Sequence, residues 1–265
     1  MKQKYVYPVL MAFVVASFWV FDTYYAPRTK QYKTTNPSGA IAAGIWPSST
    51  TGAIVHHAYY ALSYHENFEQ AEWVIYRLSK EQLTNDDRKR PYFEQDPKVI
   101  TQSADWRNYK GSGYDRGHLC PAGDRRFSED AYNETFYTSN ISPQKRDFNA
   151  GIWNRLEQKV RQWGKQYVTL YVITAGILNK DLSVIGEEQV AVPDYFYKIV
   201  VRDNGDALTS IAFLLKHEEN RSSLQHFVVP VDSIEQLSGI DFFKELPHEL
   251  EAILESKTNM SDWPF

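Results

Sequence analysis

Residues 114–126, YDRGHLCPAGDRR, place an acid, a guanidinium, a glycine and an imidazole next to one another. Gly117 allows a ligand to approach the backbone closely, and Arg116 can bind a phosphate with both arms of its guanidinium. His118 follows, and an imidazole with its ordinary pKa of about 6.5 can take a proton from water at neutral pH. Hydrolysis of a phosphodiester needs such a base and positive charge near the phosphate oxygens. This stretch therefore predicts a phosphodiester-hydrolysing site.

A second informative stretch is residues 140–161, NISPQKRDFNAGIWNRLEQKVR. Apolar residues within and just after this stretch recur at spacings of four, four and three, at Ile152, Leu156, Val160 and Trp163. This period predicts a helix over residues 149–163, with Asn149 as its cap and Gly164 at its end.

Asn149 and Glu157 are the polar residues of interest on this helix. Eight helical positions correspond to about 12 Å of rise and roughly 80° of rotation, so the two side chains are too far apart to be easy direct ligands of one ion. One direct ligand, with the other acting through metal-bound water, fits Mg²⁺ better, because this ion keeps several waters. Glu157 and Arg161 are spaced i, i+4 and could pair.

Three ordered motifs in these stretches resemble the DNA/RNA non-specific endonuclease family, whose core is the ββα-metal finger. They are Asp115-Arg116-Gly117-His118, then Ser-Asn-x-x-Pro-Gln at residues 139–144, then Asn-x-Gly-x-Trp-x-x-Leu-Glu at residues 149–157. The resemblance runs from about Val55 to Val229. It implies a metal-dependent enzyme that cleaves single- and double-stranded DNA and RNA and leaves 5′-phosphate ends.

The resemblance also implies a role for individual residues. His118 is similar to the general base, and Asn149 resembles the direct ligand of Mg²⁺, with Mn²⁺ or another divalent cation as alternatives. Glu157 is similar to the carboxylate that acts through metal-bound water. Arg116 and Arg161 resemble phosphate-binding arginines, and Asn140 stands where the family keeps a supporting asparagine.

Two further substrate-binding arginines are candidates. The family has an arginine in the loop before an Asp-Pro, and Arg90 matches it ahead of Asp96-Pro97, with Arg88 as the competing assignment. Arg125 either pairs with Asp124 or contacts substrate. Both alternatives stay open from the sequence.

Charge and composition limit the class of function. The chain has 265 residues, enough for one sizeable domain, and a formal net charge of −4. A protein that coats nucleic acid usually carries a positive excess, whereas an enzyme that releases its product needs only a local basic patch. Residues 107–126 and residues 144–161 each hold five basic against two acidic residues. The one cysteine, Cys120, excludes an intramolecular disulfide.

Strand-like segments outnumber helices and do not alternate strictly with them. This order predicts an α+β fold, with a mostly antiparallel central sheet flanked by helices and a ββα-metal core at the active site. The expected strands cover residues 54–64, 71–79, 167–174, 195–201, 208–215 and 225–229, and short helices are expected at 233–237 and 247–255.

The N-terminus predicts export. Lys2 and Lys4 precede an apolar run from Tyr5 to Phe21, which is typical of a signal anchor or signal peptide within residues 1–25; a buried first helix is the alternative. Residues 26–51 are expected to be a linker and residues 52–265 the nuclease domain. The expected location is periplasmic or extracellular, with residues 5–21 in the membrane if they are not cleaved.

Two rival functions compete with the nuclease. One is an inactive family member that binds nucleic acid or a partner, against which the joint presence of His118, Asn149 and Glu157 argues. The other is a metal-dependent phosphodiesterase for a small or lipid substrate, and the basic windows favour a polymer instead. The adjacent His56 and His57 are expected to be structural, because neighbours on a strand face opposite sides. DNA and RNA are the expected partners; the oligomeric state is not readable.

Overall fold

The computed structural model describes residues 14, 41–42, 44–258 and 260–265. The chain divides into two units, Met1–Thr35 and Asn36–Phe265, and the fold below is that of the second. The expected signal segment, residues 1–25, lies outside the described residues apart from Val14. Residues 26–40 and 43 of the expected linker also lie outside them. In the described part of the chain, no helix has the length and apolarity that a bilayer crossing requires.

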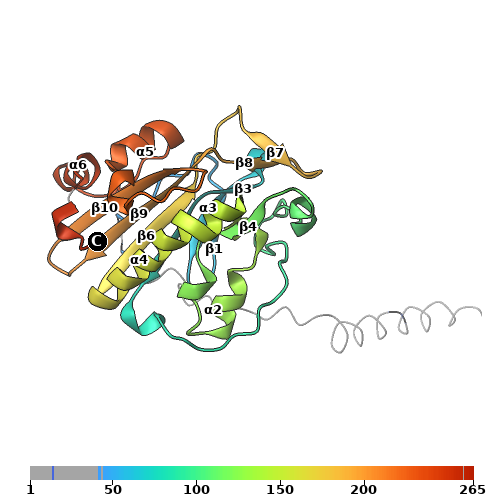
Figure 1. Ribbon diagram of the computed structural model, residues 1–265, viewed down its shortest axis with the longest axis horizontal. Helices are drawn as coiled ribbons and strands as arrows, with labels where there is room; N and C mark the ends of the chain where they lie inside the picture. Colours follow the sequence, from blue (N-terminus) through green and yellow to red (C-terminus); the bar gives the residue numbers. More distant parts are fainter. Residues whose placement is uncertain (1–13, 15–40, 43, 259) are drawn as a thin grey trace, which may run out of the picture. The chain divides into compact units, whose positions relative to one another are not determined.

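A seven-stranded sheet forms the centre of this unit (Figure 1), and every strand in it is antiparallel to its neighbours. Its strands are rich in β-branched and aromatic residues, which suit a pleated and buried surface. The α+β prediction with an antiparallel sheet is confirmed. In spatial order the strands are β1 (Ile54–His56), β2 (Ala61–His65), β3 (Gln70–Leu78), β6 (Thr169–Gly176), β9 (Tyr195–Asp203), β10 (Leu208–Lys216) and β11 (Val228–Val229).

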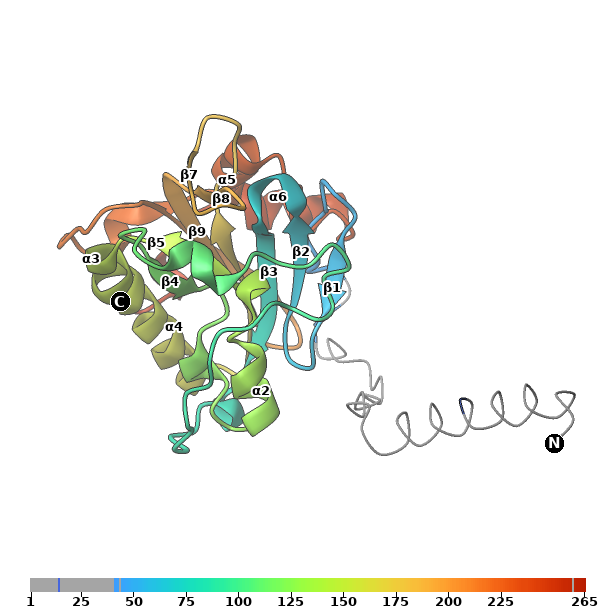
Figure 2. The same ribbon diagram turned by 90° about the vertical axis from the view of Figure 1, so that its right-hand side faces the viewer.

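Helices cover both faces of the sheet (Figures 1 and 2). The helix α4 (Asn154–Gln166) lies on one face, and α5 (Val231–Ser238) with α6 (His248–Ser256) lies on the other. Two neighbours on β9 show this arrangement, because successive strand residues point to opposite faces. Lys198 Nζ lies 4.6 Å from the centre of the Trp153 ring, beside α4, whereas the Tyr197 ring contacts Phe242, which follows α5.

The segment that carries the three sequence motifs is an excursion between two adjacent strands of the sheet. β3 and β6 are paired, with Leu78 opposite Leu170, yet the chain between them builds the β4–β5 pair and the helices beside it. The elements of this excursion are β4 (Asp115–His118), α2 (Glu129–Glu134), β5 (Ile141–Gln144), α3 (Arg146–Phe148), the π-type turn η7 (Asn149–Trp153) and α4. β4, β5 and the helix that follows form the predicted ββα arrangement.

Shorter elements complete the unit. β7 (Ser183–Ile185) and β8 (Val190–Val192) form a separate two-stranded ribbon. The short 3₁₀ turns are η2 (Glu66–Phe68), η3 (Lys80–Gln82), η4 (Trp106–Tyr109), η5 (Ala122–Asp124), η6 (Thr138–Asn140), η8 (Leu224–Phe227) and η9 (Met260–Asp262).

The folded unit begins before residue 52, where the sequence placed its start. Ile45 is fully buried in the main hydrophobic core. Trp73 also donates a hydrogen bond from Nε1 to the carbonyl of Ser48 at 2.7 Å. The described end of the expected linker is therefore part of the domain.

The predicted helix over residues 149–163 differs in its limits and regularity. Helical structure starts at Arg146, and Asn149 has helical dihedral angles (φ −60°, ψ −49°) rather than those of a cap. Gly151 interrupts the regular backbone at φ −96°, ψ −111°. Gly164 does not end the helix, which runs to Gln166; it lies against Leu78, whose Cδ2 would be 3.0 Å from an added Cβ. Close packing rather than helix termination explains this glycine.

Two expected strands also have different limits. Residues 54–64 form the hairpin β1–β2 instead of one strand, and residues 225–227 of the last expected strand belong to the turn η8. The β-branched and aromatic pattern correctly indicated these segments but did not show the turn between Ile54 and Tyr64.

Candidate active site

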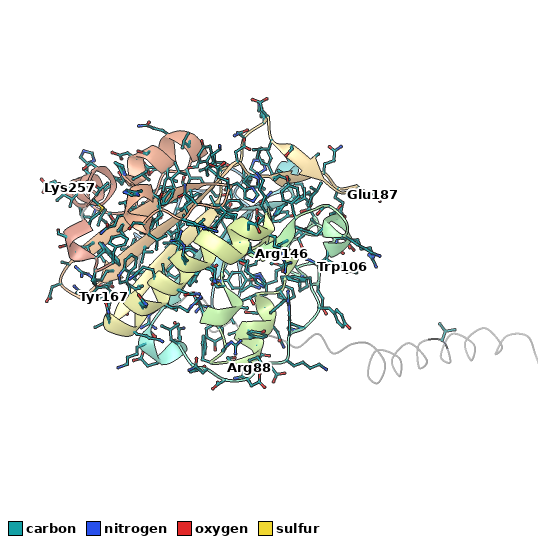
Figure 3. The ribbon with its side chains drawn as sticks, viewed as in Figure 1. Arg88, Trp106, Arg146, Tyr167, Glu187 and Lys257 are labelled. Atoms are coloured by element: carbon teal, nitrogen blue, oxygen red, sulfur yellow. The ribbon has the colours of Figure 1, made fainter. Side chains whose placement is uncertain are left out.

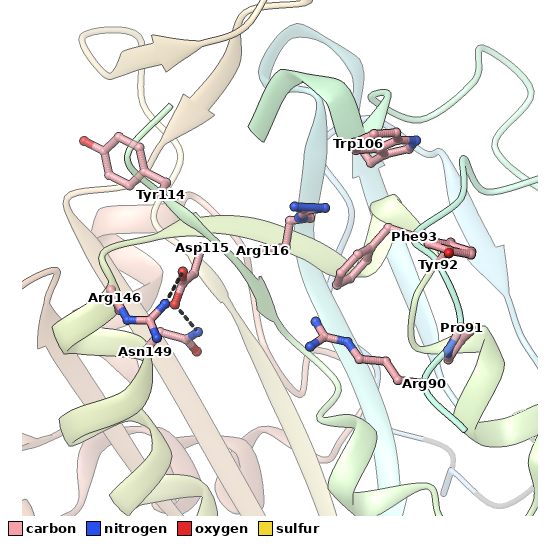
Figure 4. Close-up of a pocket in the computed structure, with 10 residues that line it drawn as sticks. All are labelled: Arg90, Pro91, Tyr92, Phe93, Trp106, Tyr114, Asp115, Arg116, Arg146 and Asn149. Atoms are coloured by element: carbon pink, nitrogen blue, oxygen red, sulfur yellow. Dashed lines mark hydrogen bonds and ion pairs between the residues drawn. The ribbon is translucent and has the colours of Figure 1, made fainter. Parts of the chain in front are cut away.

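A cleft of about 840 Å³ lies beside β4 (Figure 4). An acid, an amide, an exposed guanidinium and the ring of Tyr114 gather at one side of it, and three other aromatic rings lie at the other side, with two arginines between them. The lining residues are Arg90, Pro91, Tyr92, Phe93, Trp106, Tyr114, Asp115, Arg116, Arg146 and Asn149. Such a mixture suits a ligand that carries both negative charge and flat rings.

The β4–β5 pair places the first motif. Asp115 pairs with Gln144 and His118 pairs with Ile141, so alternation along β4 puts Arg116 and His118 on one side. A Cβ on Gly117 would lie 2.2 Å from Oε1 of Gln144, which is fully buried. A glycine at this position lets the two strands approach with that side chain between them.

Asn149 and Asp115 form the polar end of the cleft. Nδ2 of Asn149 donates to Oδ2 of Asp115 at 3.2 Å, which leaves the carbonyl oxygen Oδ1 for another partner. The other carboxylate oxygen of Asp115 is 3.8 Å from NH1 of Arg146. Amide and carboxylate oxygens are the donors that hard divalent cations prefer, so the residues present fit such an ion.

The His118 ring is largely enclosed by aromatic side chains. Its centre is 4.9 Å from that of Phe136, edge to face, and 5.6 Å from that of Phe93. Nε2 is buried and has no hydrogen-bond partner in the described structure. Burial, with a smaller contribution from the positive charge of Arg90, lowers the pKa of His118 to about 3. The imidazole is therefore neutral at neutral pH.

Two arginines project into the cleft from different segments. The guanidinium of Arg116 lies 5.0 Å from the centre of the Phe93 ring, and that of Arg90 lies 5.5 Å from the same ring. Arg88 is held elsewhere: it donates to the carbonyl of Arg126 at 2.8 Å and lies well away from Arg146 and Trp106 in Figure 3. The geometry thus favours Arg90 over Arg88 as the upstream arginine.

Glu157 and Arg161 belong to a charged network beside the cleft. NH1 of Arg161 donates to Oδ1 of the buried Asp124 at 2.8 Å and lies 3.9 Å from Oε2 of Glu157. Burial raises the pKa of Glu157, and the positive charges of Lys198 and Arg161 oppose that shift. Neither Glu157 nor Arg161 is among the residues that line the cleft. Arg161 therefore holds Asp124 and lies beside Glu157, and His118 is likewise absent from the residues that line the cleft.

Two predicted site residues are buried in the structure. Asn140 accepts a hydrogen bond from the Cys120 amide at 2.8 Å and donates to the carbonyls of Cys120 and Thr135. Its side chain ties the chain just after His118 and does not face the cleft.

Arg125 is also fully buried, and this corrects its expected contact with substrate. Its guanidinium donates to the carbonyls of Asp124, Tyr59 and Arg77, and it lies 4.7 Å from the centre of the Tyr76 ring. The sequence could not distinguish this buried cation from an exposed one, because both occur in clusters of charge.

Several lining residues were not predicted from the sequence. Arg146 is 83% exposed and three positions before Asn149, and its only signal was membership of a basic window. The aromatic residues of the cleft come from three separate segments, and none belongs to the three motifs, although one directly precedes the first: they are Tyr92, Phe93, Trp106 and Tyr114. The buried Lys198, which lies on β9 near Glu157, also had no signal.

Comparisons with known proteins agree with this geometry. The family model for the DNA/RNA non-specific endonuclease matches residues 38–249, and the chain belongs to that family. It is 38% identical over 205 residues to the human mitochondrial nuclease EXOG, covering 71% of this chain and 56% of that protein. It is 34% identical to human mitochondrial Endonuclease G over 198 residues, covering 69% of this chain and 67% of the relative.

A solved structure gives the same result for the fold. The chain matches a crystal structure of the EndoG/EndoGI complex with a TM-score of 0.68 and 32% identity, over 74% of this chain and 88% of that chain. The chain spans a little over half the length of the EXOG relatives that it matches. The predicted family and fold class are confirmed.

The expectation of an exported protein, periplasmic or extracellular, is wrong. The matched relatives are named as mitochondrial nucleases in mouse, human and yeast. The N-terminal apolar run on which that expectation rested lies outside the described residues, apart from Val14. A basic start followed by an apolar run was thus an insufficient basis for assigning a compartment.

Proposed function

We propose that this chain is a metal-dependent endonuclease that hydrolyses phosphodiester bonds of DNA and RNA with little sequence preference and leaves 5′-phosphate ends. The observation that carries the proposal is the cleft itself, which brings the Asn149–Asp115 pair to one end and Arg90 and Arg116 to its middle. The family membership supports the same class of activity.

His118 is the proposed general base. It is neutral at neutral pH, as a base must be before it accepts a proton from water. A pKa as low as about 3 makes a weak base in the free protein. The negative charge of a bound phosphate near Arg90 offsets the positive charge beside the ring, so substrate binding raises the pKa of His118 and strengthens the base.

Asn149 is the proposed direct ligand of the cation, through Oδ1, and Mg²⁺, Mn²⁺ or another hard divalent ion suits this oxygen. When bound, the ion supplies positive charge that stabilises the negative charge developing on the phosphate and the leaving oxygen. Asp115 orients the amide of Asn149 through the bond from Nδ2. Glu157 is proposed to act through water around the ion, and Arg161 holds Glu157 through the network with Asp124.

The cleft also supports the lack of sequence preference. Arg90, Arg116 and the exposed Arg146 can bind phosphates, and contacts to phosphates carry no sequence information. The aromatic side of the cleft presents Tyr92, which is 91% exposed, and Trp106. Every base has a flat face that stacks on such rings. This combination favours a polynucleotide over a small or lipid phosphodiester.

The test is cleavage of supercoiled plasmid and of total RNA by the purified protein, with Mg²⁺, with Mn²⁺ and with EDTA. We expect nicking and RNA degradation with either metal and none with EDTA. The ends should be labelled by polynucleotide kinase only after phosphatase treatment. The variant Asn149→Ala should lose metal-dependent cleavage by roughly a hundredfold, whereas Asp147→Ala, an exposed acid on α3, should cleave normally.

Two results would contradict the proposal. Binding of DNA without cleavage in any metal would indicate an inactive family member. Faster turnover of bis-p-nitrophenyl phosphate than of DNA, at equal concentrations of phosphodiester, would indicate a phosphodiesterase for small substrates.

A further inference from the structure

The loop after β10 contacts the segment that carries Asn149 on both sides of that residue. Before Asn149, the amide of Lys145 donates to Nε2 of His217 at 2.7 Å. After Asn149, the amide of Ile152 donates to Oε2 of Glu219 at 2.8 Å. Both acceptors lie three residues or fewer from the end of β10, so one short loop holds both flanks of the proposed metal ligand.

His217 is built to accept this hydrogen bond. Its Nδ1 lies 2.8 Å from the carbonyl of Pro193, which can only accept, so the proton is on Nδ1 and Nε2 is the acceptor. The ring is 3% exposed and packs edge to face against Phe148 and Phe196, at 5.1 and 5.0 Å between centres. The backbone at Lys145 is therefore bonded to the residue that directly follows β10.

Glu219 fills the irregular turn at Gly151. A Cβ on Gly151 would lie 1.9 Å from Oε2 of Glu219, so the carboxylate occupies the space that a side chain would need. The backbone here departs from helical geometry, at ψ −111°, just before α4 begins. A carboxylate at this position binds a free amide and also interacts favourably with the positive end of α4.

A third contact joins the same loop to α4. Arg155 donates to the carbonyls of Asn220 and Ser222. The loop at residues 217–222 is thus bound to residues 145, 152 and 155 in turn. Asn149 lies between the first two points of attachment, and its own side chain is held by Asp115.

We propose that His217 and Glu219 are positioning residues that fix the backbone around Asn149, so that its amide oxygen is preorganised to bind the divalent cation. The proposal rests on the function proposed above. Glu219 is exposed and contributes nothing to the hydrophobic core, so its bond to Ile152 affects the local backbone more than global stability. Partners that orient a metal ligand typically change metal affinity by 10- to 100-fold when they are removed.

The experiment compares Glu219→Ala with Glu219→Gln, which keeps an oxygen acceptor. The control is Glu218→Ala, because Glu218 is the adjacent exposed acid and pairs with Lys216 instead of with the helix. Mn²⁺ affinity is measured by calorimetry on the folded protein without nucleic acid. The Mg²⁺ concentration for half-maximal cleavage, kcat at saturating Mg²⁺ and the melting temperature are measured in parallel.

We expect Glu219→Ala to bind Mn²⁺ roughly tenfold more weakly, to need correspondingly more Mg²⁺, and to recover much of its kcat when Mg²⁺ is saturating. Glu219→Gln should restore most of the affinity, and Glu218→Ala should match the parent. A lower melting temperature with unchanged Mn²⁺ affinity in Glu219→Ala would show a purely structural role and overturn the inference. If the parent cleaves nucleic acid and both Glu219 variants bind Mn²⁺ as tightly as the parent does, the positioning role alone would be overturned. A parent that neither binds Mn²⁺ nor cleaves would overturn the proposed function and the inference with it.

Discussion

The carboxylate of Asp115 accepts a hydrogen bond from Nδ2 of Asn149, at 3.2 Å. The two residues belong to different elements, β4 and the turn η7, so this bond joins the first motif to the third. It also decides which end of the amide faces outward, because a carboxylate can accept from the nitrogen but not from the oxygen. The metal site proposed here therefore depends on the first residue of the Asp-Arg-Gly-His motif as well as on its histidine.

Replacing Asp115 should weaken cation binding without unfolding the protein. In Asp115→Ala the amide of Asn149 loses the partner that orients it, and we expect roughly tenfold weaker Mn²⁺ binding. Asp115→Asn keeps one oxygen acceptor and should lose less. Calorimetric titration with Mn²⁺ measures both variants. Equal affinity in Asp115→Ala and the parent would show that the amide needs no orientation.

Removing the charge of Arg90 should shift the acidic limb of the activity profile. Burial and then Arg90 lower the pKa of His118 to about 3, so the neutral base persists far into the acid range. In Arg90→Gln the second of these causes is removed and the pKa of His118 rises, which moves the loss of kcat/KM on acidification to higher pH. Arg88→Gln is the matched control, because Arg88 is bound to Arg126 outside the cleft. An unchanged acidic limb in Arg90→Gln, with an unchanged NMR titration of the His118 ring, would contradict the assignment.

A methyl group at Gly117 should destabilise the β4–β5 pair. It would overlap the buried side chain of Gln144, which cannot move into solvent. We expect Gly117→Ala to lower the free energy of unfolding by about 1–3 kcal/mol, as overpacking does elsewhere. The double variant Gly117→Ala/Gln144→Ala should recover part of this loss, as measured by urea unfolding. Additive losses in the double variant would show that the two side chains do not compete for space.

Stability should decline with rising pH because of Glu255 on α6. Burial, then repulsion from neighbouring acids, raises the pKa of Glu255 from 4.5 to about 8. Between these two values the folded state keeps a proton that the unfolded state has lost, so stability falls as pH rises through this window. Glu255→Gln should therefore melt at a higher temperature than the parent at pH 9 and at a similar temperature at pH 4. Glu245→Gln is the control, because Glu245 is exposed, and it should not change the dependence of the melting temperature on pH. If the melting temperature of Glu255→Gln declined with pH as steeply as that of the parent, the carboxyl of Glu255 would be excluded as the source of the decline.

The sequence predicted the scaffold well and the irregular parts of the site poorly. The long strands β6, β9 and β10 lie close to their expected limits, because β-branched and aromatic runs specify buried strands strongly, whereas the short strands β7 and β8 were not expected. No strand pattern indicated the four-residue strands β4 and β5, which only the family resemblance implied through its ββα core. They contain Gly117 and Pro143, which weaken any strand pattern, and they are held by the partner strand and the side chains around them.

The residues of the candidate site also divide into those that the sequence motifs predicted and those that only the tertiary structure identifies. The motifs brought Asp115, Arg116 and Asn149 to one cleft, as expected for residues that act together. Arg125 and Asn140 are buried supports, and their chemical type alone could not show this. Arg146 and Trp106 line the cleft through tertiary contacts, which have no signature in the local sequence. The role of His118 remains a prediction that the pH profile of Arg90→Gln addresses, and the role of Glu157 also remains a prediction.

The position of the excursion within the sheet has a consequence for how this architecture can diversify. Leu78 and Leu170 are cross-strand partners, so the two ends of the excursion between β3 and β6 meet at the same point of a continuous meander. A loop whose ends are already held together costs little extra closure entropy as it lengthens. Residues can therefore be added to or removed from this excursion at little cost in stability while the strand order of the sheet stays the same.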